Sequence, residues 1–140
     1  LKAFDQTDVA IMAAAVADYR PKEFASRKIK KTSHQLTVAL ERNPDIALLL
    51  GRKKQHQITV CFAAETNDVL ENARKKLIEK NCDLVVANDI SAEGAGFEEE
   101  TNIVTLLDRL DNCEHLPMLS KNEVANIIFD RIIAIISKTN

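Results

Sequence analysis

Lys76 and Lys80 are the residues whose placement most clearly suggests chemistry. In the helix expected over residues 67–81, a rotation of about 100° per residue puts both lysines at the apolar stripe rather than opposite it. The stripe consists of Val69, Leu70, Ala73 and Leu77. Two like charges four residues apart repel each other. Two interpretations stay open: the aliphatic stems snorkel along the core near the negative helix C-terminus, or both ammonium groups converge on a polyanion.

A second group of cations lies in an expected loop. Residues 20–31 carry six cations and one glutamate. Lys28 and Lys30 would point to the same side of an extended chain, because its side-chain period is two. The stretch is either a solvated surface or a mobile lysine flap that folds over phosphates. Its position just after an apolar strand favours the flap.

Two carboxylates and one aromatic residue are further candidates. Asp18 and Asp45 could hold Mg²⁺, a ribose or a base amine, although a helix cap explains Asp45 equally well. Asn43, Pro44 and Asp45 together are typical of a helix start, since Asn caps, Pro is tolerated at the first position and Asp favours the positive end. Phe62 either packs in the core or stacks on a base.

Composition excludes several classes of protein. The net charge of −2 argues against a general nucleic-acid binder, and no apolar run approaches the ~20 residues that cross a bilayer. The three glycines cannot form either of the common glycine-rich phosphate loops. The histidines His34, His56 and His115 lack metal-ligand spacing, so they are assigned no metal role. The three cysteines, Cys61, Cys82 and Cys113, are expected to be free structural thiols in a reducing cytoplasm.

The elements that must position these residues alternate along the chain. Strands are expected at residues 8–15, 36–40, 58–64, 83–87 and 102–108. Helices are expected from Asn43 to about residue 54, over 67–81, and after a capping box at 120–123. This order predicts one α/β domain over 1–140, with a mainly parallel sheet flanked by helices. Ligands in such folds bind beyond the carboxyl ends of the strands, here near 15–20, 63–67 and 87–90. Asn88 and Asp89 are interpreted as a turn, and the acidic loop 93–100 as solvated or as a lid.

Five ordered segments together resemble the phosphopantothenoylcysteine synthetases, the phosphopantothenate–cysteine ligases of coenzyme A biosynthesis. The segments are AAVADYRP (14–21), KIKK (28–31), NPDI (43–46), FAAET (62–66), and Lys76 and Lys80 followed by DLVVAND (83–89). Gly96-Phe97 and Asn102 extend the match, so that the resemblance covers nearly the whole chain.

The resemblance implies a reaction. Such a ligase joins 4′-phosphopantothenate to cysteine: CTP and Mg²⁺ convert the carboxylate to an acyl-cytidylate with loss of pyrophosphate, the cysteine amine attacks, and CMP leaves. The alternatives are a non-catalytic nucleotide-binding or oligomerisation module, and a Rossmann-type dehydrogenase, which the absence of GxGxxG disfavours.

The resemblance also implies roles for matching residues. The cytidine and ribose pocket would be formed by Asp18, Asn43, Pro44, Asp45 and Ile46, with Met12 and Phe62 lining it. Lys76 and Lys80 would grip the triphosphate. Lys28 would be the flap lysine that stabilises charge while the acyl-cytidylate forms, with Lys30 beside it.

The chain departs from the family pattern in two ways. Cys61 stands where many relatives have glycine. The strand and glycine loop with which the family begins are absent, and the chain starts at Leu1 rather than Met. We therefore expect a C-terminal portion of a cytoplasmic, dimeric ligase domain, inactive by itself. FMN would belong only to a fused phosphopantothenoylcysteine decarboxylase outside this chain.

Overall fold

A five-stranded sheet forms the centre of the computed structural model, which describes residues 2–29, 35–65, 67–89 and 100–139. Its strand order is β1 (Val9–Met12), β4 (Ile58–Glu65), β5 (Leu84–Asp89), β7 (Val104–Asp108) and β8 (Cys113–His115). β1, β4 and β5 are parallel, and the hairpin of β7 and β8 extends the sheet in antiparallel fashion. The predicted α/β fold with a mainly parallel sheet is confirmed.

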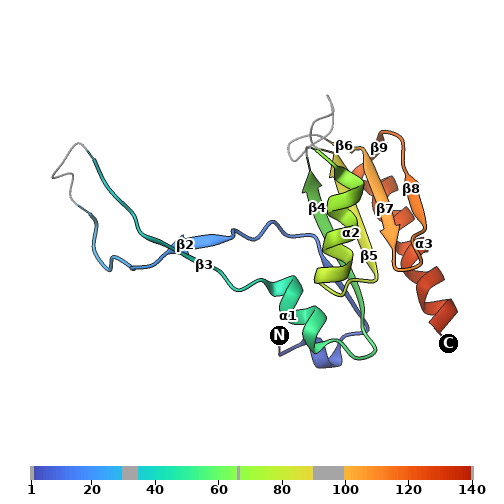
Figure 1. Ribbon diagram of the computed structural model, residues 1–140, viewed down its shortest axis with the longest axis horizontal. Helices are drawn as coiled ribbons and strands as arrows, with labels where there is room; N and C mark the ends of the chain where they lie inside the picture. The colour runs from blue at the N-terminus through green and yellow to red at the C-terminus, as the bar shows by residue number, and fades with distance from the viewer. Residues whose placement is uncertain (1, 30–34, 66, 90–99, 140) are drawn as a thin grey trace.

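Helices cover both faces of this sheet (Figure 1). α2 (Val69–Glu79) and α1 (Ile46–Lys53) pack on one face, where the strands present small residues such as Cys61, Ala63 and Ala87. α3 (Lys121–Thr139) packs on the other face, against larger strand residues such as Val86 and Leu106. Because both faces are covered, the strands read as continuous apolar runs in the sequence.

A two-stranded arm projects from this body (Figure 1). It consists of β2 (Tyr19–Pro21) and β3 (Leu40–Arg42), which pair antiparallel with Tyr19 opposite Arg42, and the described residues 22–29 and 35–39 beyond them. The expected strand over 36–40 is therefore wrong in its position, because the ladder forms only where β2 provides a partner. The remaining elements are a short 3₁₀ helix (Phe4–Gln6) and the pair β6 (Thr101–Asn102) and β9 (Leu119–Ser120).

The boundaries of several elements differ from the expectation. β1 ends at Met12, so that the alanine-rich residues 13–18 continue as irregular backbone. The cap of α1 is Asp45, whose Oδ1 accepts a hydrogen bond from the Leu48 N–H at 2.9 Å. The capping box before α3 is confirmed, since the Ser120 and Glu123 side chains bond each other's backbone N–H groups.

The expectation that all three cysteines are free thiols is wrong. Cys61 and Cys82 form a disulfide, and only Cys113 is a free, exposed thiol. Cys61 lies in β4 and Cys82 follows α2, which packs on β4, so that their Cα atoms are 6.4 Å apart. A separation of 21 residues in the sequence gives no sign of this proximity. Within the described ranges, no helix combines the length and the apolar character needed to cross a bilayer.

Candidate functional site

A cleft of about 900 Å³ opens at the carboxyl ends of β1 and β4. Five parts of the chain line it: residues 11–19, residues 42–47, residues 61–64, Lys76 and Lys80 at the end of α2, and Asn88 in β5. Its position agrees with the rule that ligands of parallel sheets bind beyond the carboxyl ends of the strands. We refer to this site below as the cleft.

The cleft contains every residue to which the family resemblance gives a role in nucleotide binding. These nine residues are Met12, Asp18, Asn43, Pro44, Asp45, Ile46, Phe62, Lys76 and Lys80. They come from β1, the segment after it, the start of α1, β4, and the C-terminal end of α2. Residues that are far apart in the sequence therefore line the same cleft.

The two residues expected to be catalytic are placed differently. Lys28 lies on the arm and is not among the described residues that line the cleft, and the arm beyond β2 projects away from the body in Figure 1. Lys30 lies outside the described residues, as does most of the acidic loop 93–100. The arm is thus the element that carries the expected flap lysine.

Lys80 forms an ion pair with Asp45 across the cleft wall. Asp45 also caps α1 through the Leu48 N–H. Burial raises the pKa of Asp45, but the hydrogen bonds from Lys80 and from the Leu48 N–H outweigh it and hold the pKa below its ordinary value. The carboxylate therefore stays ionised and fixes the Lys80 ammonium at the start of α1.

Lys76 reaches the same cleft from one helical turn earlier. Its ammonium donates to the main-chain oxygen of Phe62 over 3.4 Å, at the carboxyl end of β4. Both lysines thus line the same cleft, as the polyanion interpretation requires.

Gly51 brings α1 close enough to α2 for this arrangement. A Cβ atom at Gly51 would lie 1.9 Å from the main-chain oxygen of Lys80. The Asn81 side chain donates to the Gly51 main-chain oxygen over 2.8 Å and holds the two helix ends together. The absence of a side chain at residue 51 therefore sets the distance between Lys80 and the Asp45 end of α1.

Asn88 also lines the cleft, in the region 87–90 where ligands are expected, although the sequence assigns it no binding role. It was expected in a turn, but β5 continues through it, because Ala64 and Asn88 are partners in the ladder with β4. Its Oδ1 atom is buried and has no hydrogen-bond partner among the described residues. A buried acceptor beside a cleft is suited to a ligand donor, since an unsatisfied polar group costs about 1–3 kcal/mol. The sequence feature that could have indicated a binding role for Asn88 is its position as a polar residue at the end of an apolar strand.

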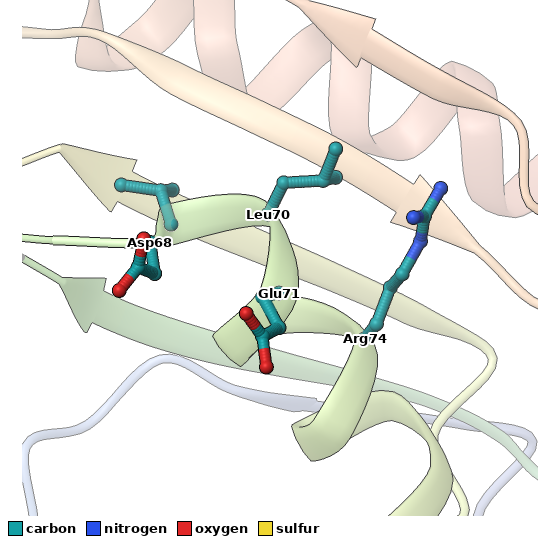
Figure 2. Close-up of a pocket in the computed structure, with 5 residues that line it drawn as sticks. Asp68, Leu70, Glu71 and Arg74 are labelled. Carbon is teal, nitrogen blue, oxygen red and sulfur yellow. The ribbon is translucent and has the colours of Figure 1, made fainter.

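A second, smaller depression of about 470 Å³ lies over the first turns of α2 (Figure 2). The side chains of Asp68, Leu70, Glu71 and Arg74 project around it from that one helix. Arg74 is committed to Asp111 through two hydrogen bonds of 3.0 Å, and Glu71 pairs with Lys75. Because these charges are already paired, this depression is not the candidate site.

No group of three metal-ligating side chains comes together within the described part of the chain. The carboxylates that line the cleft are Asp18 and Asp45, and Asp45 is paired with Lys80. This donor set does not form a protein cage, but it is compatible with Mg²⁺, which keeps waters and binds through one or two carboxylates plus substrate phosphates.

Comparison with known proteins identifies relatives of this chain. The family model for the "DNA/pantothenate metabolism flavoprotein C-terminal domain" matches residues 1–136. The coenzyme A biosynthesis bifunctional protein CoaBC of Bacillus subtilis (strain 168) is 46% identical over 139 residues, which are 99% of this chain and 34% of that protein. The protein of the same name from Escherichia coli (strain K12) is 41% identical over 132 residues, 91% of this chain and 32% of that protein.

A solved structure agrees with these matches. The crystal structure of the C-terminal domain of a CoaBC protein has a TM-score of 0.78 and 38% identity, over 98% of this chain and 59% of that chain. The chain spans about a third of the length of the curated relatives that it matches. The resemblance inferred from the motifs is confirmed: the chain belongs to the family of DNA/pantothenate metabolism flavoprotein C-terminal domains.

Proposed function

We propose that this chain provides the nucleotide site of a CTP-dependent phosphopantothenate–cysteine ligase. One observation carries the proposal: the nine residues that the ligase resemblance assigns to nucleotide binding line a single cleft. The match to CoaBC proteins supports a role in coenzyme A biosynthesis. The choice of CTP over ATP rests on the resemblance alone.

The proposed chemistry has two steps. A carboxylate oxygen of 4′-phosphopantothenate attacks the α-phosphorus of CTP, and pyrophosphate leaves. The amine of cysteine then attacks the acyl carbon, loses a proton, and CMP leaves. Negative charge accumulates on phosphoryl oxygens in the first step, so positioned cations lower its barrier.

The residues of the cleft fit the first step. Lys76 and Lys80 would bind the triphosphate, and Phe62 and Met12 would flank the base and ribose. Asp18 would face the nucleotide or a Mg²⁺ ion that arrives with the phosphates and neutralises part of their charge. Lys28, with Lys30, would reach the reacting phosphate by movement of the arm or from a second copy of the chain.

The proposal extends to the whole protein. It would be a cytoplasmic homodimer, in which the upstream part of the ligase domain completes the phosphate site. FMN would serve only a fused decarboxylase, as the bifunctional names of the relatives suggest. A non-catalytic nucleotide-binding module is the alternative, favoured by the position of Lys28 away from the cleft.

Mass spectrometry on the complete protein tests this proposal. The protein receives 4′-phosphopantothenate, Mg²⁺ and either CTP or ATP, without cysteine. We expect an acyl-cytidylate and pyrophosphate from CTP alone. An acyl-adenylate from ATP would overturn the nucleotide assignment, and nucleotide binding without any adduct would support the non-catalytic module.

Substitutions of Lys76 and Lys28 test the roles proposed for these two lysines. Lys76→Gln should weaken CTP binding about tenfold or more, because a hydrogen bond between charged groups contributes about 1.5–3 kcal/mol. Lys75→Gln is the matched control, since Lys75 is exposed, pairs with Glu71 on the same helix and does not line the cleft. Lys28→Ala should abolish adduct formation while CTP binding persists. Equal affinities for the two helix variants would contradict the role of Lys76.

A further inference from the structure

The wall of the cleft formed by residues 13–18 has no strand or helix to hold it. β1 ends at Met12 and β2 begins at Tyr19, so that the backbone between them is irregular. Two hydrogen bonds from Asn43 hold it. The Asn43 N–H donates to the Asp18 main-chain oxygen over 2.8 Å, and the Asn43 Nδ2 donates to the Ala17 main-chain oxygen over 2.7 Å. Asn43 therefore joins two walls of the cleft.

Arg20 orients the side chain of Asn43. Its Nη1 donates to the Asn43 Oδ1 over 3.1 Å, at the end of the amide opposite to the one that bonds Ala17. An amide has one acceptor end and one donor end, so a cation beside Oδ1 determines which way the group points. With Oδ1 toward Arg20, Nδ2 must face the wall at residue 17.

Glu41 holds Arg20 in turn. Arg20 and Glu41 are directly opposite in the ladder of β2 and β3. The Arg20 Nε and Nη2 atoms lie 2.9 Å and 2.7 Å from the Glu41 Oε1. The planar guanidinium group directs separate N–H groups at Glu41 and Asn43 in a fixed geometry, whereas a lysine ammonium would have to reach both acceptors from one nitrogen atom.

We propose that Arg20 is a positioning residue for the nucleotide site: the chain Glu41–Arg20–Asn43 couples the base of the arm to the wall at residues 17 and 18. Arg20 does not itself line the cleft within the described residues, so it acts through Asn43. This inference rests on the proposed nucleotide function and adds a specific role for the base of the arm, which holds the wall at residues 17 and 18 in place through Asn43.

Nucleotide affinity and steady-state kinetics of the complete protein test this inference. The variants are Arg20→Ala, Arg20→Lys and Glu41→Gln, with Lys22→Ala as the matched control that removes a cation from the same arm. Each is measured for CTP binding by calorimetry and for kcat and KM. Arg20→Ala should raise the Kd and KM for CTP about tenfold with little change in kcat, because uniform binding is lost. Arg20→Lys and Glu41→Gln should give smaller effects in the same direction, and Lys22→Ala none.

If Arg20 contributed only to stability, its substitution would change kcat and KM in a different way. Lower stability reduces the amount of active protein, and with it kcat, without changing KM. Amide hydrogen exchange adds a readout that needs no nucleotide: the Asn43 N–H, bonded to Asp18, should exchange faster in Arg20→Ala than in Lys22→Ala. If Arg20→Ala fails to fold, Arg20→Lys and Glu41→Gln carry the same comparison.

The outcomes separate this inference from the proposed function. A wild-type protein that binds neither CTP nor ATP refutes the function, and the exchange experiment then decides the contact between Arg20 and Asn43 by itself. A wild-type protein that binds CTP, with Arg20 variants of unchanged KM and unchanged Asn43 exchange, overturns the positioning role.

Discussion

Replacing Gly51 by alanine should separate α1 from the end of α2. The new Cβ atom would lie 1.9 Å from the Lys80 main-chain oxygen and 2.8 Å from its carbon, where ordinary contact begins at 3.4 Å. The helix ends must therefore move apart by about 1.5 Å, the difference between 3.4 and 1.9 Å. The obstacle is backbone, so a side-chain rotation cannot relieve the clash.

The magnitude follows from two opposing effects. Overpacking costs about 1–3 kcal/mol, and the upper part of that range applies because backbone must shift. Alanine recovers about 1 kcal/mol relative to glycine within a helix. We expect Gly51→Ala to lower the free energy of unfolding by about 2 kcal/mol, and the melting temperature by roughly 4–8 °C. It should also weaken CTP binding, since Lys80 lies at the displaced contact.

Urea unfolding followed by circular dichroism measures this effect. The matched control is Arg52→Ala at the next, exposed position of α1, which should stay within about 0.5 kcal/mol of the wild type. A Gly51→Ala protein that is as stable as the wild type, or more stable by the roughly 1 kcal/mol that alanine gains over glycine in a helix, would refute the close approach of α1 and α2.

Two further predictions concern the same part of the molecule. Asp45→Asn keeps the helix cap but loses the ion pair with Lys80. The folded pKa of Asp45 lies below its ordinary value, so the stabilisation is fully present above about pH 4 and is lost as the pH falls through the folded pKa. The urea midpoints of variant and wild type should therefore differ at pH 7, and the difference should shrink progressively as the pH is lowered below about 4. Equal midpoints at pH 7 would contradict it. Thiol titration of the unfolded protein should find one reactive thiol, Cys113, before reduction and three reactive thiols after it. Reduction of the Cys61–Cys82 bond should lower the free energy of unfolding by about 3 kcal/mol. Three reactive groups in the unreduced protein would contradict the disulfide.

Local sequence signals were sufficient for the elements near the site. The sequence predicted both β4 and α2. A strand that is buried on both faces, such as β4, is a continuous apolar run, whereas a helix that is buried on one side, such as α2, has apolar residues every three or four positions. The same wheel showed that Lys76 and Lys80 lie beside the core rather than opposite it. The motifs then predicted which residues meet, and the cleft contains all of the expected nucleotide contacts.

Pairing between distant segments could not be predicted in the same way. β2 and β3 are too short and too polar to show a period, and each exists only because the other supplies its hydrogen bonds. Asn88 was interpreted as a turn for the same reason, since its place in β5 depends on the partner strand β4. The Cys61–Cys82 bond likewise depends on how α2 packs against the sheet.

The residue types by themselves determined the fold class, the capping box before α3 and the supply of cations near a strand end, because these depend on period, composition and near neighbours. Tertiary structure alone decided which charges face one another. Lys80 is paired with Asp45, Asn43 is held by Arg20, and Asn88, which lines the cleft, has a buried acceptor without a partner among the described residues. The physical reason is that each contact joins segments whose distance is set by packing, as at Gly51, where one missing side chain lets two helices meet.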